Sequence, residues 1–406
     1  MTGPLNRLRG ELPSHLKGLV ERQTPIPSIA QRAGAKQKEV PTLVRADIGQ
    51  ISGLDPELEV LYGSPVGLER TRELIAESWN LSFGLAGREG FGDGLTPANV
   101  AVTTGAGEAL AVSLRAAAHD AIVAIPTIHW ENYLNGVQAA KGSVAPVKFF
   151  DDEGRLDTDH LREQIRECGA RVLLSNFPAN PTGAVLSEDE ARSLGRMAEE
   201  LDLVVISDEV YVRLRYDGQP PQTLLTAAPD HVIAVGAASK EYLMPGARVG
   251  YAISAHTEVT DFVLRKLIRT ASGSPNVLGQ ARLNQLLESD VADLRAGREP
   301  GILTKVRDEM ASRRAALVEV LTKHGFPLRG RPKHEPQGTI FLMVGLPDWF
   351  DGSDEEFVER ALESGCVSCV PGGAFGLPGA LRFSYGGMTE QAIVQLDSNF
   401  ERFRSS

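Results

Sequence analysis

Short apolar runs alternate with amphipathic stretches over residues 100–255 of the chain. The runs are continuous in Val, Ile, Leu and Ala, which is typical of strands buried on both faces of a sheet. They predict strands at Val100–Thr104, Ala121–Ile125, Arg171–Phe177, Leu203–Asp208, Val232–Ala237 and Val249–Ser254. The stretches between them predict helices at Glu108–Ala118, Glu131–Ala140, Asp157–Cys168 and Glu188–Leu201. Because strands and helices alternate, we expect a mostly parallel sheet flanked by helices on both faces.

The pattern changes after about residue 273, where a long charged helix is predicted over residues 302–324. The segment behind it predicts a strand near 339–344, a helix after Ser353, short strands near 367–370 and 381–385, and a last helix to about residue 404. Two Ser-x-x-Glu sequences, Ser187 with Glu190 and Ser353 with Glu356, have the spacing of capping boxes that begin helices.

The chain is therefore expected to be an α/β protein with two domains. A large domain with the mostly parallel sheet is assigned to residues 55–290, and a small α+β domain to residues 291–406. Residues 1–45 are polar and punctuated by proline. We expect residues 1–54 to form an N-terminal arm that is part of the small domain.

The composition is that of an ordinary globular enzyme, with 406 residues, 42% hydrophobic and 23% charged. The 53 acidic residues outnumber the 42 Lys and Arg and give a net charge of −11, which argues against nucleic acid or an anionic membrane as a partner. No apolar run reaches the ~18 residues that a membrane span needs, and no signal-peptide run is seen. Three cysteines suit a reducing cytoplasm, which is the expected location.

A lysine and an arginine closely follow one of the predicted strands. Lys240 comes just after the strand that ends at Ala237, and Arg248 lies eight residues later in a glycine-rich turn. Burial at the end of a core strand lowers the pKa of a lysine and makes its amine nucleophilic. The alternative interpretation of Lys240 is an ordinary lysine in an exposed loop. An arginine in such a turn can bind a phosphate with two hydrogen bonds. Pyridoxal 5′-phosphate (PLP) requires both an imine-forming lysine and a phosphate site.

The segment Ser239-Lys240-Glu-Tyr-Leu-Met-Pro-Gly-Ala-Arg248-Val-Gly250 resembles the cofactor-lysine motif of the fold type I, class I/II aminotransferase family. Further motifs of this family follow in the family's order over residues 45–390. The resemblance implies a PLP-dependent enzyme of fold type I. It also implies that Lys240 binds the cofactor aldehyde and that Ser239 and Arg248 bind its phosphate.

Two more segments resemble motifs that hold the cofactor ring. Asn180-Pro-Thr-Gly183 resembles the family's Asn-Pro-x-Gly turn, which implies that Asn180 binds the phenolic oxygen of PLP and lies beside the substrate. Ser207-Asp208-Glu-Val-Tyr211 resembles Asp-Glu-x-Tyr, which implies that Asp208 faces the pyridine nitrogen and that Tyr211 donates to the phenolic oxygen. A carboxylate there keeps the nitrogen protonated, so the ring can accept electrons. An ordinary Asn-Pro turn and a capping aspartate are the alternatives.

A glycine-rich turn and an aromatic residue complete the predicted cofactor site. Gly105, Ala106 and Gly107 lie between a predicted strand and helix, where backbone N–H groups favour an anion, and the resemblance assigns them to the phosphate. The match to Gly-x-Gly-x-x-Gly is incomplete, so a dinucleotide site is the weaker alternative. Trp130 is predicted to stack on the cofactor ring, with His129 as the competing residue.

Three residues are predicted to contact either the substrate or the cofactor of a partner subunit. Tyr62-Gly-Ser-Pro-Val-Gly67 resembles a family segment whose tyrosine reaches the neighbouring cofactor phosphate, which implies a homodimer. Leu381-Arg382-Phe-Ser384 resembles the family's C-terminal arginine strand, which implies that Arg382 binds the substrate α-carboxylate. Gly49 is assigned beside the same carboxylate. A generic surface arginine is the alternative for Arg382.

The resemblance implies an aminotransferase that moves an amino group between an L-amino acid and a 2-oxo acid by a ping-pong mechanism, with Lys240 as general base. The same residues support elimination, replacement and ring closure, so a PLP-dependent lyase, cyclase or replacement enzyme is the alternative. A ligand-sensing domain of a transcription factor and a nicotinamide-dependent oxidoreductase fit less well. Ala237 and Gln50-Ile51 depart from the family pattern. No metal is expected, because Cys366-Val-Ser-Cys369 has no second ligand pair.

Overall fold

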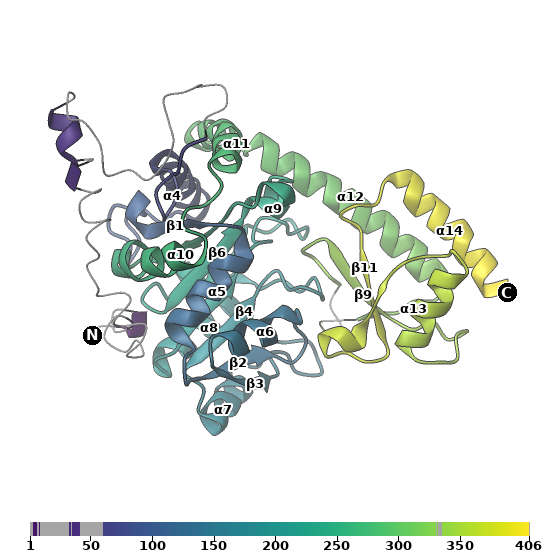
Figure 1. Cartoon of the computed structure of the whole chain (residues 1–406). Helices are drawn as coiled ribbons and strands as arrows, with labels where there is room; N and C mark the ends of the chain where they lie inside the picture. Colours follow the sequence, from purple (N-terminus) through teal and green to yellow (C-terminus); the bar gives the residue numbers. More distant parts are fainter. Residues whose placement is uncertain are drawn as a thin grey trace.

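The structure is a computed structural model that describes residues 3–5, 8, 32–33, 35–40, 60–329, 331 and 335–405. Within these residues the chain forms a large α/β domain and a smaller domain with an antiparallel sheet, and the long helix α12 (Gly301–Lys323) runs from one to the other (Figure 1). This arrangement confirms the predicted fold class. The domain boundaries stay predictions, because most of residues 1–54 lie outside the described residues.

The large domain contains a seven-stranded sheet in the order β1-β7-β6-β5-β4-β2-β3. Its strands are β1 (Val100–Thr103), β2 (Ile122–Pro126), β3 (Ser143–Val147), β4 (Val172–Asn176), β5 (Val204–Asp208), β6 (Val232–Ala237) and β7 (Gly250–Ile253). Neighbours from β3 to β6 pair in parallel, whereas β7 is antiparallel to both β1 and β6. The six predicted strands are confirmed, and the antiparallel direction of β7 was not predicted.

Helices cover both faces of this sheet. The large domain contains α4 (Glu69–Phe83), α5 (Ala106–Ala117), α6 (Asn132–Ala139), α7 (Thr158–Cys168), α8 (Glu188–Glu200), α9 (Ala238–Glu241), α10 (Arg265–Ala271) and α11 (Val277–Arg295). Side chains of α4, α7, α8 and α11 share one buried cluster with one side of the strands, and those of α5, α6 and α10 share a second cluster with the other side. Successive strand residues point to opposite faces, so Leu173 belongs to the first cluster and Leu174 to the second.

The small domain is built on a four-stranded antiparallel sheet in the order β10-β11-β9-β8. Its elements are β8 (Leu328–Arg329), β9 (Phe341–Gly345), α13 (Asp354–Glu363), β10 (Val370–Pro371), β11 (Ala380–Ser384) and α14 (Glu390–Ser405). Phe326 lies at the centre of its core, with ring contacts to Phe357, Phe383 and Phe400. Both predicted capping boxes are formed, at the first residues of α8 and α13.

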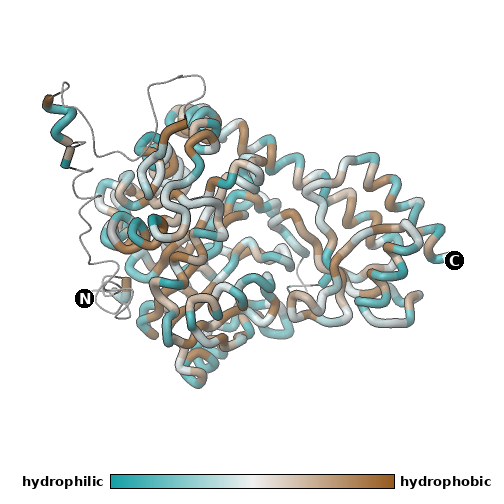
Figure 2. Tube along the Cα trace, viewed as in Figure 1, coloured by the Kyte–Doolittle hydropathy of each residue, from teal (hydrophilic) through white to brown (hydrophobic). Residues whose placement is uncertain are grey.

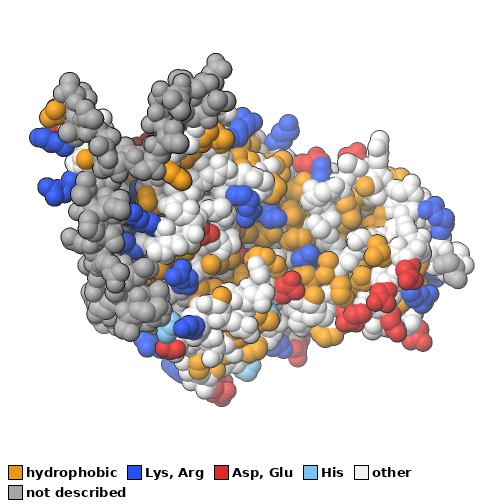
Figure 3. Space-filling view, in the orientation of Figure 1, with side chains coloured by type: hydrophobic (Ala, Val, Ile, Leu, Met, Phe, Trp, Pro, Cys, Tyr) orange, Lys and Arg blue, Asp and Glu red, His pale blue; other side chains and the backbone are white. Residues whose placement is uncertain are grey.

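The surface follows the same plan. Hydrophobic positions gather along the central strands, and hydrophilic positions lie on the outer faces of the helices (Figure 2). On the face shown in Figure 3, hydrophobic side chains gather where the two domains meet, and acidic side chains gather on the outer part of the small domain. No helix in the described part of the chain is long and apolar enough to cross a membrane.

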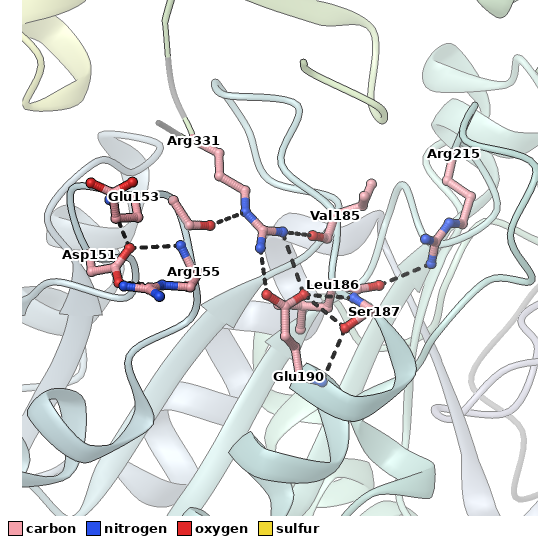
Figure 4. Close-up of polar contacts among 10 residues, drawn as sticks. Asp151, Glu153, Arg155, Val185, Leu186, Ser187, Glu190, Arg215 and Arg331 are labelled. Carbon is pink, nitrogen blue, oxygen red and sulfur yellow. Dashed lines mark hydrogen bonds and ion pairs between the residues drawn. The ribbon is translucent and has the colours of Figure 1, made fainter. Parts of the chain in front are cut away.

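The two domains are joined by close contacts around the segment before β9. Arg331 donates to the carbonyls of Gly154 and Val185 and pairs with Glu190, whose carboxylate also caps α8 (Figure 4). The guanidinium carbon of Arg331 lies 4.6 Å from the ring centre of Phe150. These contacts fix the small domain over the ends of the strands, where the predicted site residues lie.

Candidate active site

Three neighbouring parallel strands end side by side at one edge of the large sheet. Asn176 at the end of β4 is in register with Asp208 at the end of β5, and β6 leads directly into α9, which carries Lys240. Because the carboxyl ends of parallel strands share an edge, residues from separate parts of the sequence meet there. The structure thus brings the predicted Lys240 and Asp208 to one edge, where Asn176 also accepts a hydrogen bond from the backbone of the predicted Asn180.

Asp208 is a buried carboxylate with a defined set of partners. The Tyr133 hydroxyl donates to its Oδ2 at 2.6 Å, and the Val210 backbone N–H donates to Oδ1 at 3.4 Å. Burial raises the pKa of Asp208 to about 6, and these two hydrogen bonds and the nearby Lys240 oppose the rise. The Asn176 amide donates to the Asp208 carbonyl at 2.8 Å, which fixes the backbone. A buried carboxylate of this kind favours a cationic ligand group beside it.

Lys240 lies on the short helix α9 and is half-buried. Burial lowers the pKa of its amine, the Arg382 charge lowers it further, and Asp208 opposes both. Its Nζ lies 5.8 Å from the ring centre of Tyr211. Tyr211 is buried, and burial raises its pKa above the ordinary value, so its phenol stays neutral and can donate a hydrogen bond. Ser239 precedes the lysine in the same helical turn.

A cradle for an anion lies at the start of α5. Gly105 has φ 79° and precedes the first helical residue, Ala106, so the N–H groups of Ala106 and Gly107 have no partner within the helix itself. A Cβ on Gly105 would lie 2.6 Å from Nη2 of Arg248, and a Cβ on Gly250 would lie 2.4 Å from the Ala106 nitrogen. Glycine is required at both positions for this close approach. The turn and the guanidinium together fit a phosphate group.

Arg382 extends from β11 of the small domain toward the same place. Its guanidinium carbon lies 4.3 Å from the ring centre of Phe341 and 4.4 Å from that of Phe375. Nη1 donates to the Asn180 side-chain oxygen at 3.3 Å, whereas Nε is buried and has no hydrogen-bond partner within the described residues. Arg382 thus contacts two aromatic rings and has its Nε–H group available as a hydrogen-bond donor, which fits a carboxylate ligand.

The remaining predicted residues are less closely tied to this site. Trp130 is half-buried and contacts the Tyr133 ring edge-on at 5.6 Å. His129 lines a cavity of about 640 Å³ that Tyr133 and Asn180 also line. That Trp130 rather than His129 stacks on the cofactor stays a prediction. Tyr62 lies on the surface, 80% exposed, and not among the residues around Lys240. Gly49 lies outside the described residues.

The structure also shows residues that the sequence reasoning did not assign. Tyr133 binds Asp208 directly, and Asn176 links the two motifs by donating to Asp208 and accepting from the Asn180 backbone at 2.7 Å. Tyr133 lies in the first turn of α6, three residues after Trp130, and this short spacing to a predicted site residue was the available signal for it. Phe341 and Phe375 come from separate segments of the small domain, and nothing in their local sequence indicated a shared role.

A desolvated lysine, a buried carboxylate and an anion cradle define the site of a PLP-dependent enzyme. The sequence model described as aminotransferase class I and II matches residues 34–396. Among curated proteins, the aspartate/prephenate aminotransferase of Thermus thermophilus is 28% identical over 95% of this chain and 94% of its own length. The aspartate aminotransferase of Streptomyces avermitilis is 30% identical over 70% of this chain and 68% of its own. The chain therefore belongs to the aminotransferase class I and II family and is a PLP-dependent aminotransferase.

Solved structures agree with this assignment. A structure of Thermus thermophilus aspartate aminotransferase with maleate superimposes with a TM-score of 0.74, at 27% identity over 94% of this chain and 97% of that one. An aromatic aminotransferase from Pyrococcus horikoshii gives a TM-score of 0.72 at 25% identity, covering 95% of this chain and 92% of that one. The residues present in this chain fit the cofactor. Gly250, which packs against the Gly105 turn, pairs with Ala237 directly before the helix that carries Lys240, and the buried Asp208 lies at the end of the neighbouring strand β5.

Glu209, beside Asp208, is a second buried carboxyl group. Its Oε1 accepts from the Ser207 hydroxyl at 2.8 Å and from the Leu224 backbone N–H at 3.0 Å. Its Oε2 is buried without a hydrogen-bond partner in the part of the chain that the structure describes. Burial raises the pKa of Glu209 to about 7, and its hydrogen bonds oppose the rise. Glu209 therefore holds the segment behind the site but carries an electrostatic cost when it ionises.

We predict that Glu209→Gln flattens the pH dependence of stability of the cofactor-free enzyme. The folded state keeps a proton on Glu209 up to about pH 7, whereas the unfolded state loses it near 4.5, so stability falls as pH rises through this window. In urea unfolding, the loss of stability between pH 5 and pH 7.5 should be about 2 kcal/mol smaller in the variant than in the wild type; the contribution of Asp208, whose pKa is also raised, remains in both. The exposed Glu163→Gln is the control. An unchanged slope in Glu209→Gln would contradict the assignment.

Proposed function

We propose that this aminotransferase transfers the amino group of an L-amino acid to a 2-oxo acid in two half-reactions at one site, with Lys240 covalently holding PLP. The observation that carries the proposal is the meeting of Lys240, Asp208 and Arg382, from α9, β5 and β11, at one edge of the large sheet. Burial lowers the pKa of Lys240 most, the Arg382 charge lowers it further, and the Asp208 charge opposes both. Such coupling at one edge is typical of a catalytic site.

Each residue around the lysine has a role that suits its surroundings. We propose that Asp208 holds the ring nitrogen, that Tyr211 and Asn180 donate to the phenolic oxygen, and that Trp130 covers the ring. The N–H groups of Gly105, Ala106 and Gly107, with Ser239 and Arg248, would bind the phosphate. Arg382 would bind the α-carboxylate, since its Nε lacks a hydrogen-bond partner among the described residues. The rings of Phe341 and Phe375 beside its guanidinium limit its contact with water. Gly49 beside that carboxylate remains a prediction.

The chemistry divides between the cofactor and the chain. When bound, PLP supplies an aldehyde that takes up the amino group and a ring that accepts electrons from Cα. Lys240 supplies the base: because burial lowers the pKa of its amine, a larger fraction is neutral and able to take the Cα proton. Asp208 keeps a negative charge opposite the ring nitrogen, which stabilises positive charge there.

The substrates are proposed from the names of the relatives. Similar proteins are called aspartate/prephenate and aspartate aminotransferases, so L-aspartate is the first donor to test. Aromatic amino acids come next, because a similar solved structure is that of an aromatic aminotransferase. We also propose that the enzyme works in the cytoplasm. Its three cysteines are free thiols, and burial raises the pKa of Cys366 to about 11 and that of Cys369 to about 12. Such thiols persist in a reducing compartment.

A homodimer would complete the site. Tyr62 is 80% exposed, and the neighbouring Val60 and Leu61 are also exposed. Leu278, at the start of the helix that this segment contacts, is exposed as well. A group of large apolar side chains on one surface favours contact with another protein surface. We propose that this surface meets a second copy of the chain and that Tyr62 binds the partner's cofactor phosphate.

The reaction can be tested with the amino donor alone. An aminotransferase without an oxo-acid acceptor should release one 2-oxo acid per active site and stop, whereas a lyase or cyclase continues to turn over. We expect a stoichiometric burst from wild type with L-aspartate or an aromatic donor, and no burst from Lys240→Ala, whose rate should fall at least ~10²-fold. Continued release of product or ammonia without an acceptor would contradict transamination.

The shared site can be tested by mixing two variants that are defective in different ways. Tyr62→Ala should weaken PLP binding about 10-fold or more by removing a hydrogen bond to a charged group, and Lys240→Ala should abolish covalent attachment. In a mixed dimer, one site would combine an intact Lys240 with an intact Tyr62 from the other chain. Refolding the two chains together should therefore restore a class of sites with wild-type PLP affinity. If Tyr62 acts within its own chain, no such class appears.

A further inference from the structure

A buried ion pair lies directly behind the proposed catalytic lysine. Arg213 donates from Nη1 to Oε2 of Glu241 at 2.9 Å, and its backbone N–H donates to Oε1 of the same carboxylate at 3.3 Å. The two side chains are only 8% and 2% exposed. Glu241 is the residue after Lys240, so the pair touches the helix that carries the amine.

The pair connects the two segments that carry the reactive groups. β5 ends at Asp208, and the turn that follows it, residues 210–213, contains Tyr211 and ends at Arg213. Directly after this turn the Leu214 N–H donates to the Tyr211 carbonyl at 2.7 Å. Glu241 belongs to α9, which has four residues. A single helical turn is too short to hold its own shape. The position of Lys240 relative to Tyr211 therefore depends on contacts such as the one between Glu241 and Arg213.

Arg213 is itself held on other sides by α4. Its Nη2 donates to the hydroxyl groups of Ser78 at 3.3 Å and Ser82 at 3.5 Å. Its guanidinium carbon lies 5.7 Å from the ring centre of Trp79 and 5.3 Å from that of Phe83. The arginine therefore has little freedom to move, and its hydrogen bonds restrict the carboxylate of Glu241 in turn.

Stability alone does not account for this pair. Replacing a buried ion pair with packed hydrophobic residues is often neutral or stabilising, because both charges lose their hydration on burial. Burial raises the pKa of Glu241 above its ordinary value in spite of the arginine beside it, which shows that this cost is present here. The ion pair forms hydrogen bonds of defined direction and length, which an apolar pair cannot form.

We propose that Arg213 and Glu241 are positioning residues that set the place of the Lys240 amine relative to Tyr211 and Asp208. The proposal rests on the proposed function of Lys240. It assigns no proton transfer to the pair, which acts through the backbone of α9. A displacement of about 1 Å between reacting groups can lower a rate by ~10²-fold, so a brace of this kind has a measurable effect on catalysis.

The decisive variant is the double substitution Arg213→Leu with Glu241→Leu, which removes the link without leaving a buried charge. Either substitution alone would leave one charge unpaired and could prevent folding. Glu241→Gln is the conservative variant, since its amide oxygen can still accept from Arg213. The control is Arg72→Leu with Asp261→Leu, an arginine–carboxylate pair whose arginine lies on α4. Arg72 donates to Asp261 at 3.2 Å and to the Val100 carbonyl at 2.8 Å, and Asp261 also accepts from Arg265 at 2.6 Å.

Two measurements separate position from stability. We call Arg213→Leu with Glu241→Leu the brace variant. In the holoenzyme, we expect the brace variant to keep its unfolding midpoint and its KM for the amino donor while its kcat falls ~10²-fold. Glu241→Gln should retain part of the kcat that the brace variant loses. On the cofactor-free enzyme, the pH dependence of acetylation of Lys240, followed by mass spectrometry, should shift toward that of an ordinary lysine near about 10.4. The control pair should lower the unfolding midpoint and leave both kcat and the Lys240 profile unchanged.

Each other outcome overturns the proposal. Wild-type kcat and an unshifted Lys240 profile in the brace variant would show that the pair does not position the lysine. A kcat loss that follows the unfolding midpoint equally in the brace and control variants would show a structural role only. The acetylation profile of Lys240 does not depend on transamination. If the wild-type enzyme fails to transaminate, the proposed function is refuted, and the profile still tests whether Arg213 and Glu241 position Lys240.

Discussion

A carboxylate buried at the end of a central strand is the constraint on which the site depends. Burial raises the pKa of Asp208 to about 6, and its ionised form is held by the Tyr133 hydroxyl at 2.6 Å. A buried negative charge is stable only beside positive charge or strong donors. Lys240 supplies part of that charge, but the same burial lowers the pKa of its own amine. A cationic ring would balance the charge of Asp208, and an aldehyde would take up the neutral amine of Lys240; PLP, the cofactor of this family, carries both groups.

The fold around this carboxylate was largely predictable, because it follows from hydrophobic burial. The central strands are buried along their whole length, so their sequences are continuous in apolar residues. β3 was missed, because it lies at the sheet edge, is half-exposed and contains Pro146, and such a strand has no continuous apolar pattern. The antiparallel direction of β7 was not predictable, since an apolar run gives no information about strand direction.

The site was predictable where a motif is local and was missed where contacts join distant segments. Lys240 and Asp208 each lie in a short motif at the end of a strand. The bond between Tyr133 and Asp208 joins residues 75 positions apart, and that between Arg213 and Glu241 joins residues 28 apart. Such pairs depend on which strands are neighbours, and the sequence pattern does not show that order. For the same reason the supporting residues of the site appeared only in the structure.

The central claim is that the Asp208 carboxylate faces the cofactor's ring nitrogen and keeps it protonated. The most direct measurement is ¹⁵N NMR of the enzyme reconstituted with PLP that carries ¹⁵N in the ring. We predict a protonated nitrogen at pH 7.5 in the wild type and an unprotonated one in Asp208→Asn, which keeps the size of the side chain and removes its charge. An unprotonated ring nitrogen in the wild type, or the same protonation state in both proteins, would contradict this account.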